Sequence, residues 1–148
     1  MIRLASETDA TAIKDCADQA YAPYIARIGQ KPAPMVADYE AKIAAETIWV
    51  ATDEDGDFQG FIVFFPDGPH LMLENVAVLP VAAGRGIGKS LIRFCEDEGR
   101  RRGCASVRLC TNAKMTENLL IYPRLGYVEV GRRTENGFAR VYFEKPLS

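Results

Sequence analysis

The residues whose chemistry is most evident lie in one short, glycine-rich segment near the middle of the chain. It runs Gly84, Arg85, Gly86, Ile87, Gly88, Lys89, Ser90. Glycine reaches backbone conformations that other residues rarely adopt, so an anion can approach the amide N–H groups with no Cβ atom in the way. A helix that begins here would add further unpaired N–H groups and a partial positive charge. The segment therefore predicts a phosphate-binding site.

The flanking segments predict the strand and the helix that such a site needs. Residues 71–80 (LMLENVAVLP) are mostly apolar and end at a proline, as in a buried strand. After the glycines, apolar residues recur at three- and four-residue steps, namely Ile87, Leu91, Phe94 and Cys95. We expect an amphipathic helix there that ends at Gly103. Its other side should carry Lys89, Arg93, Glu96 and Asp97.

Two well-known phosphate loops fit this segment incompletely. The dinucleotide pattern G-x-G-x-x-G fails because Lys89 stands where the last glycine is needed. The P-loop pattern is matched by Gly88-Lys89-Ser90, but Ala83 replaces its first glycine. A P-loop enzyme also needs an aspartate at the end of a neighbouring strand, and the strand after the helix ends VRLCTN. A P-loop nucleotide-binding protein is kept as an alternative.

The strand and the loop together resemble the coenzyme A signature of the GNAT acetyltransferases, a strand V-A-V-x-P followed by Q/R-x-x-G-x-G/A. Here the two parts are Val76-Ala-Val-Leu-Pro80 and the segment from Ala83 to Gly88. A second segment, Tyr122-Pro-Arg-Leu-Gly126-Tyr127, is similar to the family's Y-x-x-x-G-F/Y. Both motifs stand in the family's order with one strand between them, and the resemblance covers residues 1 to 143.

The resemblance implies that acetyl-CoA is the co-substrate. In the family, amides of the turn and the following helix hold the pyrophosphate, and the preceding strand pairs with the pantetheine arm. By position, the coenzyme-binding residues are Val76, Ala77, Val78, Ala83, Gly84, Arg85, Gly86, Ile87, Gly88, Lys89 and Asn118. Ala83 lacks the side-chain contact of the family's Gln or Arg. Met115 stands where the family has an asparagine, so that residue is displaced to Asn118 or its role is replaced.

Acetyl transfer from a thioester to an amine requires a neutral amine, a polarised carbonyl and a proton for the departing thiolate. The resemblance implies that a backbone amide near Val78 holds the acyl oxygen and that Tyr122 is the general acid. A phenol has a pKa of roughly 10 and a thiol of roughly 8.5, so this proton transfer requires hydrogen-bond reach. The alternative for Tyr122 is packing against the coenzyme.

Glu74 is the candidate base. It lies at the same parity as Val76 and Val78 on the central strand, and a carboxylate is costly to bury among apolar residues without a purpose. It would accept the proton of the amine directly or through water. The alternative is a carboxylate that faces solvent or pairs with an arginine. Asn75 is placed for a structural hydrogen bond.

The rest of the chain predicts an α/β (α+β) fold with a mixed, mostly antiparallel sheet of six to seven strands flanked by helices, as in the GNAT family. Before the loop we expect strands at residues 2–5, 47–52 and 58–65, and helices after Ser6 and at residues 35–46 with Tyr39 and Ile43 buried. After it we expect a strand at 105–110 parallel to the central one, a helix at 116–124, and a terminal hairpin at 126–144. Residues 1–148 should form one domain.

Composition restricts the partners. The chain is 48% hydrophobic and carries a formal net charge of −2, which argues against nucleic acid or a membrane as its main partner. No run approaches the ~18 apolar residues of a membrane helix, and no signal peptide is evident, so we expect a cytoplasmic protein. We expect no metal site, because the four cysteines show no C-x-x-C spacing and the chain has a single histidine, His70.

These features predict an acetyl-CoA-dependent N-acyltransferase that acts on a primary amine of a small molecule or peptide by direct attack. A non-catalytic acyl-CoA-binding module is the alternative from another class. Tyr21, Tyr24 and Arg27 stand where an acceptor could be recognised, but such residues more often serve packing, and we assign them no role. The edge of the terminal hairpin leaves a homodimer open.

Overall fold

The computed structural model describes residues 1–147, which form two compact units. The first comprises Met1–Phe64 and Asn75–Phe94, and the second comprises Phe65–Glu74 and the chain from Cys95 onward. The single domain expected for residues 1–148 stays a prediction, and its last residue lies outside the described part of the chain. Among the described helices, none is long and apolar enough to cross a membrane.

The strands form a mixed seven-stranded sheet in the order β1-β2-β3-β4-β5-β7-β6, flanked by helices. They are β1 (Ile2–Leu4), β2 (Ile48–Thr52), β3 (Phe58–Asp67), β4 (His70–Val78), β5 (Ser106–Asn112), β6 (Val128–Glu135) and β7 (Phe138–Pro146). The β1–β2, β2–β3, β5–β7 and β6–β7 pairs are antiparallel, whereas β4 and β5 pair in parallel. The predicted fold class and the predicted parallel pair are confirmed.

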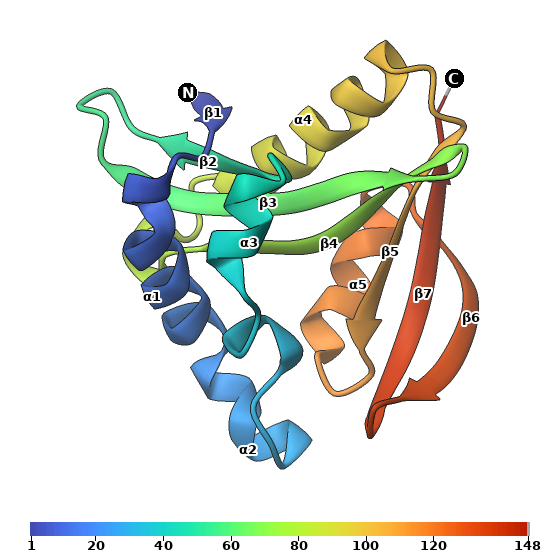
Figure 1. The fold of residues 1–148 in the computed structure, drawn as a ribbon. Helices are drawn as coiled ribbons and strands as arrows, with labels where there is room; N and C mark the ends of the chain where they lie inside the picture. The colour runs from blue at the N-terminus through green and yellow to red at the C-terminus, as the bar shows by residue number, and fades with distance from the viewer. Residues whose placement is uncertain (148) are drawn as a thin grey trace. The chain divides into compact units, whose positions relative to one another are not determined.

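In the first unit, α1 (Ala10–Tyr21) packs its apolar face against β2 and β3 (Figure 1). Three buried α1 residues at helical spacing form one cluster with four strand residues: Ile13, Cys16, Ala17, Ile48, Val50, Phe61 and Val63. The short helices of this unit are η1 (Glu7–Asp9), η2 (Ala22–Tyr24), α2 (Ile25–Ile28), η3 (Ala33–Met35), α3 (Tyr39–Ala44) and η4 (Pro80–Ala82). Asp9 accepts the Ser6 N–H at 2.8 Å in the capping box of η1, and it pairs with Arg3 at 2.8 Å.

The helix expected at residues 35–46 is shorter than predicted. A 3-10 turn ends at Met35, and α3 begins only at Tyr39. The Asp38 carboxylate accepts the Ala41 N–H at 3.1 Å and so caps α3, which makes Asp38 a start signal rather than an interior residue. Tyr39 and Ile43 are buried, as predicted.

The second unit contains α5 (Thr116–Arg124), β5 and the β6–β7 hairpin, and α5 lies beside β5 and β7 (Figure 1). The hairpin turns through Asn136 and Gly137, both with positive φ (53° and 80°), which is the chemistry of a tight two-residue turn. β7 rather than β6 pairs with β5, from Ser106↔Pro146 to Asn112↔Arg140. The predicted bounds of α5 are confirmed.

One face of α4 (Ile87–Arg101) differs from the prediction. Glu96 was expected on the side opposite the apolar residues, but it is buried, with 6% of its surface exposed. The buried positions are Leu91, Ile92, Cys95, Glu96 and Gly99. Ile92 stands one turn before Glu96, so the buried stripe is wider than the pattern of Leu91, Phe94 and Cys95 indicated.

Candidate active site

The glycine loop of the first unit presents a row of unpaired backbone N–H groups. Among the described residues, the N–H groups of residues 84–89 form no backbone hydrogen bond. On either side, the Ala83 N–H bonds to the Pro80 carbonyl at 3.2 Å, and the Ser90 N–H bonds to the Gly86 carbonyl at 3.0 Å. Because α4 begins at Ile87, part of this row is the N-terminus of a 15-residue helix. This arrangement suits the diphosphate of a coenzyme, since it combines several donors with the positive end of a helix dipole.

Two of the three loop glycines are required by the backbone. Gly84 and Gly86 have φ of 81° and 78°, values that residues with a Cβ rarely adopt. Gly88 differs from them: its φ is not positive, because it already lies in the first turn of α4. A Cβ there would lie 3.6 Å from Val78 Cγ2, which is ordinary packing contact.

The β4 residues predicted to line the coenzyme continue past the ladder with β5. That ladder runs from His70↔Ser106 to Leu73↔Leu109, whereas β4 extends to Val78. Ala77 is buried, and Val76 and Val78 are half-buried. β3 approaches so closely here that a Cβ at Gly60 would lie 2.6 Å from the Ala77 carbonyl oxygen, so glycine is needed at that position.

A buried hydrogen-bonded group fixes β4 just before these residues. The Tyr21 hydroxyl lies 2.5 Å from Asn75 Oδ1 and 3.1 Å from the Val76 carbonyl oxygen. Asn75 Nδ2 donates to the Tyr39 hydroxyl at 3.0 Å, and that hydroxyl donates to the Pro34 carbonyl. The sequence assigned Tyr21 no role. The sequence feature that could have indicated a role for Tyr21 is Asn75, because a polar residue on the buried side of a strand needs hydrogen-bond partners.

Glu74 belongs to the second unit and is exposed. The argument that its carboxylate is buried at a cost is therefore wrong, because Glu74 takes the outward parity of β4 while Leu73 and Asn75 point inward. The predicted parity with Val76 and Val78 is confirmed. Its role as a base stays a prediction.

Tyr122 also belongs to the second unit and is buried on α5, with 7% of its surface exposed. Its ring packs against Tyr127 and Phe143, with 5.8 Å between ring centroids in each case. Burial, with a smaller effect of Cys110, raises the pKa of Tyr122 to about 12. The phenol is therefore protonated at neutral pH and able to act as a proton donor.

Asn118 uses its amide within the second unit. Its Nδ2 donates to Thr111 Oγ1 at 3.0 Å and lies 3.7 Å from Met115 Sδ. These contacts tie the first turn of α5 to the end of β5. The predicted contact between Asn118 and pantetheine stays a prediction.

Arg85 and Lys89 of the loop are exposed, and the Ser90 hydroxyl donates back to the Gly86 carbonyl at 3.0 Å. A serine at the start of a helix often forms such a bond to the carbonyl four residues earlier. The structure thus places the predicted residues from Val76 to Lys89 in the first unit and Glu74, Asn118 and Tyr122 in the second.

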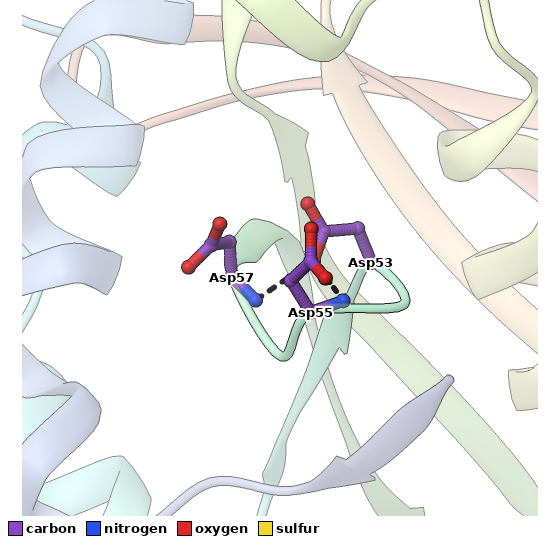
Figure 2. Close-up of side chains that lie close together, drawn as sticks. All are labelled: Asp53, Asp55 and Asp57. Atoms are coloured by element: carbon purple, nitrogen blue, oxygen red, sulfur yellow. Dashed lines mark hydrogen bonds between the residues drawn. The ribbon is translucent and has the colours of Figure 1, made fainter.

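Three carboxylates gather in the β2–β3 turn, where Figure 2 shows Asp53, Asp55 and Asp57 side by side. Asp53 Oδ1 accepts the N–H groups of Asp55 and Asp57, each at 2.9 Å (Figure 2). All three residues are exposed. These hydrogen bonds are the ordinary chemistry of an aspartate-rich turn.

Known proteins match the chain along most of its length. A model of the Acetyltransferase (GNAT) family matches residues 13–127. Streptothricin acetyltransferase of Streptomyces lavendulae is 30% identical over 94 residues, which are 62% of this chain and 50% of that protein. The chain thus spans about half the length of this curated relative.

Two crystal structures share the fold. PaiA N-acetyltransferase from Thermoplasma acidophilum, in complex with coenzyme A, has a TM-score of 0.81 at 17% identity and covers 99% of this chain and 98% of that one. The ribosomal-protein-S18-alanine N-acetyltransferase from Escherichia coli has a TM-score of 0.76 at 21% identity and covers 100% and 94%. At these identities the likeness concerns the fold alone.

Proposed function

The chain belongs to the Acetyltransferase (GNAT) family, and from this premise we propose that it transfers acetyl from acetyl-CoA to a primary amine of a small molecule or peptide. The observation that carries the proposal is the row of N–H groups at residues 84–89, which make no backbone hydrogen bond among the described residues. The diphosphate of coenzyme A supplies the charge and the acceptor oxygens that such a row binds. Val76, Ala77 and Val78 would pair with the pantetheine arm as an added strand.

In this proposal the amine nitrogen attacks the thioester carbonyl carbon directly, and no residue forms a covalent intermediate. A backbone N–H near Val78 holds the carbonyl oxygen as negative charge develops on it. When the adduct collapses, the C–S bond breaks, and the leaving sulfur takes the proton of the Tyr122 hydroxyl. The nitrogen loses its proton to Glu74 or water, and solvent returns a proton to Tyr122.

The raised pKa of Tyr122 sets the timing of its step. Its value of about 12 exceeds that of a thiol, roughly 8.5, so transfer to a fully formed thiolate is unfavourable. The proton must therefore move while the C–S bond is still breaking. Glu74 is exposed, so its carboxylate would act on the amine through water as readily as by contact.

Calorimetric titration tests the binding part. We expect acetyl-CoA to bind and ATP with Mg²⁺ to bind far more weakly or not at all. Tight binding of ATP with no binding of acetyl-CoA would overturn the proposal and restore the P-loop alternative.

A turnover assay tests the chemical part. Release of free thiol from acetyl-CoA would be followed with streptothricin, spermidine and a peptide with N-terminal alanine as acceptors. Streptothricin comes first because the curated relative described above is named for it. Binding of acetyl-CoA without turnover of any acceptor would favour the non-catalytic binding module.

A further inference from the structure

A partly buried ionic cluster in the second unit joins α4 to β7. The Glu96 carboxylate, 6% exposed, accepts two hydrogen bonds of 2.9 Å. Tyr127 Oη donates to its Oε2, and Lys145 Nζ donates to its Oε1. Both oxygens of the buried carboxylate are thus paired with donors, one of which is charged. We call Glu96, Tyr127 and Lys145 the Glu96 cluster.

Lys145 also holds the C-terminus of α5. Its Nζ donates to the carbonyl oxygen of Leu125, the residue that caps this helix, at 2.9 Å. Pro123 has no N–H, so the last turn of α5 lacks one helical hydrogen bond. An ammonium group at this helix end supplies a hydrogen-bond donor and a favourable charge in the turn that lacks a helical hydrogen bond. Gly126 makes room, because a Cβ there would lie 3.2 Å from Lys145 Cε.

The cluster reaches Tyr122 through Tyr127. The two rings meet edge to face at 69°, with centroids 5.8 Å apart. The hydroxyl of Tyr127 is anchored on Glu96, and burial together with the Glu96 charge raises the pKa of Tyr127, so it remains a hydrogen-bond donor. Tyr122 is therefore held from two directions, by the helix end that Lys145 caps and by the ring that Glu96 anchors.

Stability alone does not account for an ion pair at this place. Buried charges lose their hydration, and apolar residues of similar size often stabilise a protein as well or better. Buried ionic groups are instead suited to fixing one geometry, since their partners have defined positions. The group whose geometry is fixed here is the residue proposed as the acid.

We propose that Glu96 and Lys145 are positioning residues for the reaction, which set the Tyr122 hydroxyl through Tyr127 and the last turn of α5. The inference rests on the proposed function of Tyr122. It extends that function to two residues that touch neither substrate nor coenzyme in the proposed mechanism.

Two substitutions test the inference by kinetics. Lys145→Met removes the charge and keeps the chain length, and Glu96→Gln keeps the shape but places an amide donor against the ammonium group. Using the panel acceptor that wild type turns over fastest, we expect kcat to fall about tenfold in each variant, because small displacements of a reacting group slow catalysis. The acetyl-CoA dissociation constant should stay within about twofold, since it depends on the loop amides.

The matched control is Glu98→Gln on the same helix. Glu98 pairs with Arg101 at 2.7 Å and with Arg102 at 3.2 Å, both exposed, and these ion pairs lie outside the Glu96 cluster. Its kcat should equal that of wild type. If Lys145→Met does not fold, Tyr127→Phe replaces it, because that change removes one hydroxyl and leaves the ion pair in place.

Combining Glu96→Gln with Tyr122→Phe shows whether Glu96 acts by positioning Tyr122 or by a general structural effect. If the cluster acts through Tyr122, Glu96→Gln should lower kcat no further once the hydroxyl is gone. An equal additional loss in that background, or unchanged kcat in folded single variants, would overturn the inference. A normal kcat in Tyr122→Phe itself would instead overturn the proposed acid, which is a separate failure.

Fluorine NMR gives a readout that needs no acceptor. With 3-fluorotyrosine incorporated, the signal of Tyr122 is assigned by its absence in Tyr122→Phe, among the six tyrosines of the chain. That signal should shift or broaden in Glu96→Gln and stay in place in Glu98→Gln. A Tyr122 signal unchanged in all variants of the cluster would contradict the positioning role.

Discussion

The two ends of α4 differ in which groups carry the chemistry. At the N-terminal end the groups proposed to bind the coenzyme are backbone N–H groups, and the side chains there, such as Arg85 and Lys89, are exposed. Toward the C-terminal end the important group is one side chain, Glu96, which is buried and paired. If backbone N–H groups bind the coenzyme, having Ala83 in place of the family's Gln or Arg removes only one side-chain contact. The proposed positioning of Tyr122, by contrast, depends on the identity of each side chain in the Glu96 cluster.

The strongest test of the backbone end is Gly86→Val. A β-branched residue cannot readily adopt φ of 78°, so the loop must change shape and the row of N–H groups is lost. We expect acetyl-CoA affinity to fall at least about 100-fold, because several hydrogen bonds to a charged group are lost together. Titration calorimetry would measure it. Gly56→Val, at φ 83° in the β2–β3 turn, imposes the same strain elsewhere and should leave affinity intact.

Tyr122→Phe tests the side-chain chemistry, and we expect it to change kcat rather than acetyl-CoA affinity. Removing the acid should lower kcat by about 100-fold, as is typical of a lost general acid. The dissociation constant of acetyl-CoA should change by less than about threefold, because a proton is needed only as the C–S bond breaks. Steady-state kinetics with calorimetry would separate the two quantities. Equal loss of both would mean that Tyr122 packs against the coenzyme instead.

Asp9→Asn shows what a buried carboxylate does when its role is structural. Hydrogen bonds from Arg3, and less from the Ser6 N–H, lower the pKa of Asp9 in the folded protein. The stabilisation is present above the unfolded pKa of about 4 and is lost as pH falls through the lower folded pKa. We expect Asn to lower the free energy of unfolding by about 1 kcal/mol at pH 7, and by less at pH 3, with kcat unchanged. Urea unfolding at both pH values would measure the difference, and an equal effect at both would contradict the assignment.

The smallest expected effect is a flat pH profile. Because its pKa is raised to about 12, Tyr122 keeps its proton until the pH approaches that value, so loss of the acid should not slow the reaction below pH ~11. With an acceptor amine already deprotonated, kcat should stay level from pH 9 to pH 10.5, as roughly one unit or more still separates these values from the pKa. Stopped-flow thiol release would measure it. A descending limb near pH 9 would show that the acid has an ordinary or lowered pKa.

Local patterns predicted most of the elements. The strands at residues 47–52 and 58–65, the bounds of α5 and the terminal hairpin were all predicted, since turn chemistry and periodicity act between neighbours in the chain. The helix expected at residues 35–46 begins only at Tyr39, because the Asp38 carboxylate accepts the Ala41 N–H and caps it there. Periodicity of the apolar residues alone did not mark that start.

The glycine loop, the strand before it and the helix after it could be predicted from local sequence, because backbone donors need only the right local conformation. The motif that contains Tyr122 could be recognised in the same way. Three features could be known only from the folded chain: Glu74 is exposed, Asn75 is held by two tyrosines, and Glu96 is buried against Lys145, 49 residues away. Whether a polar side chain is solvated or paired depends on residues distant in sequence, and a local sequence pattern does not show which of those residues will contact it in the folded protein.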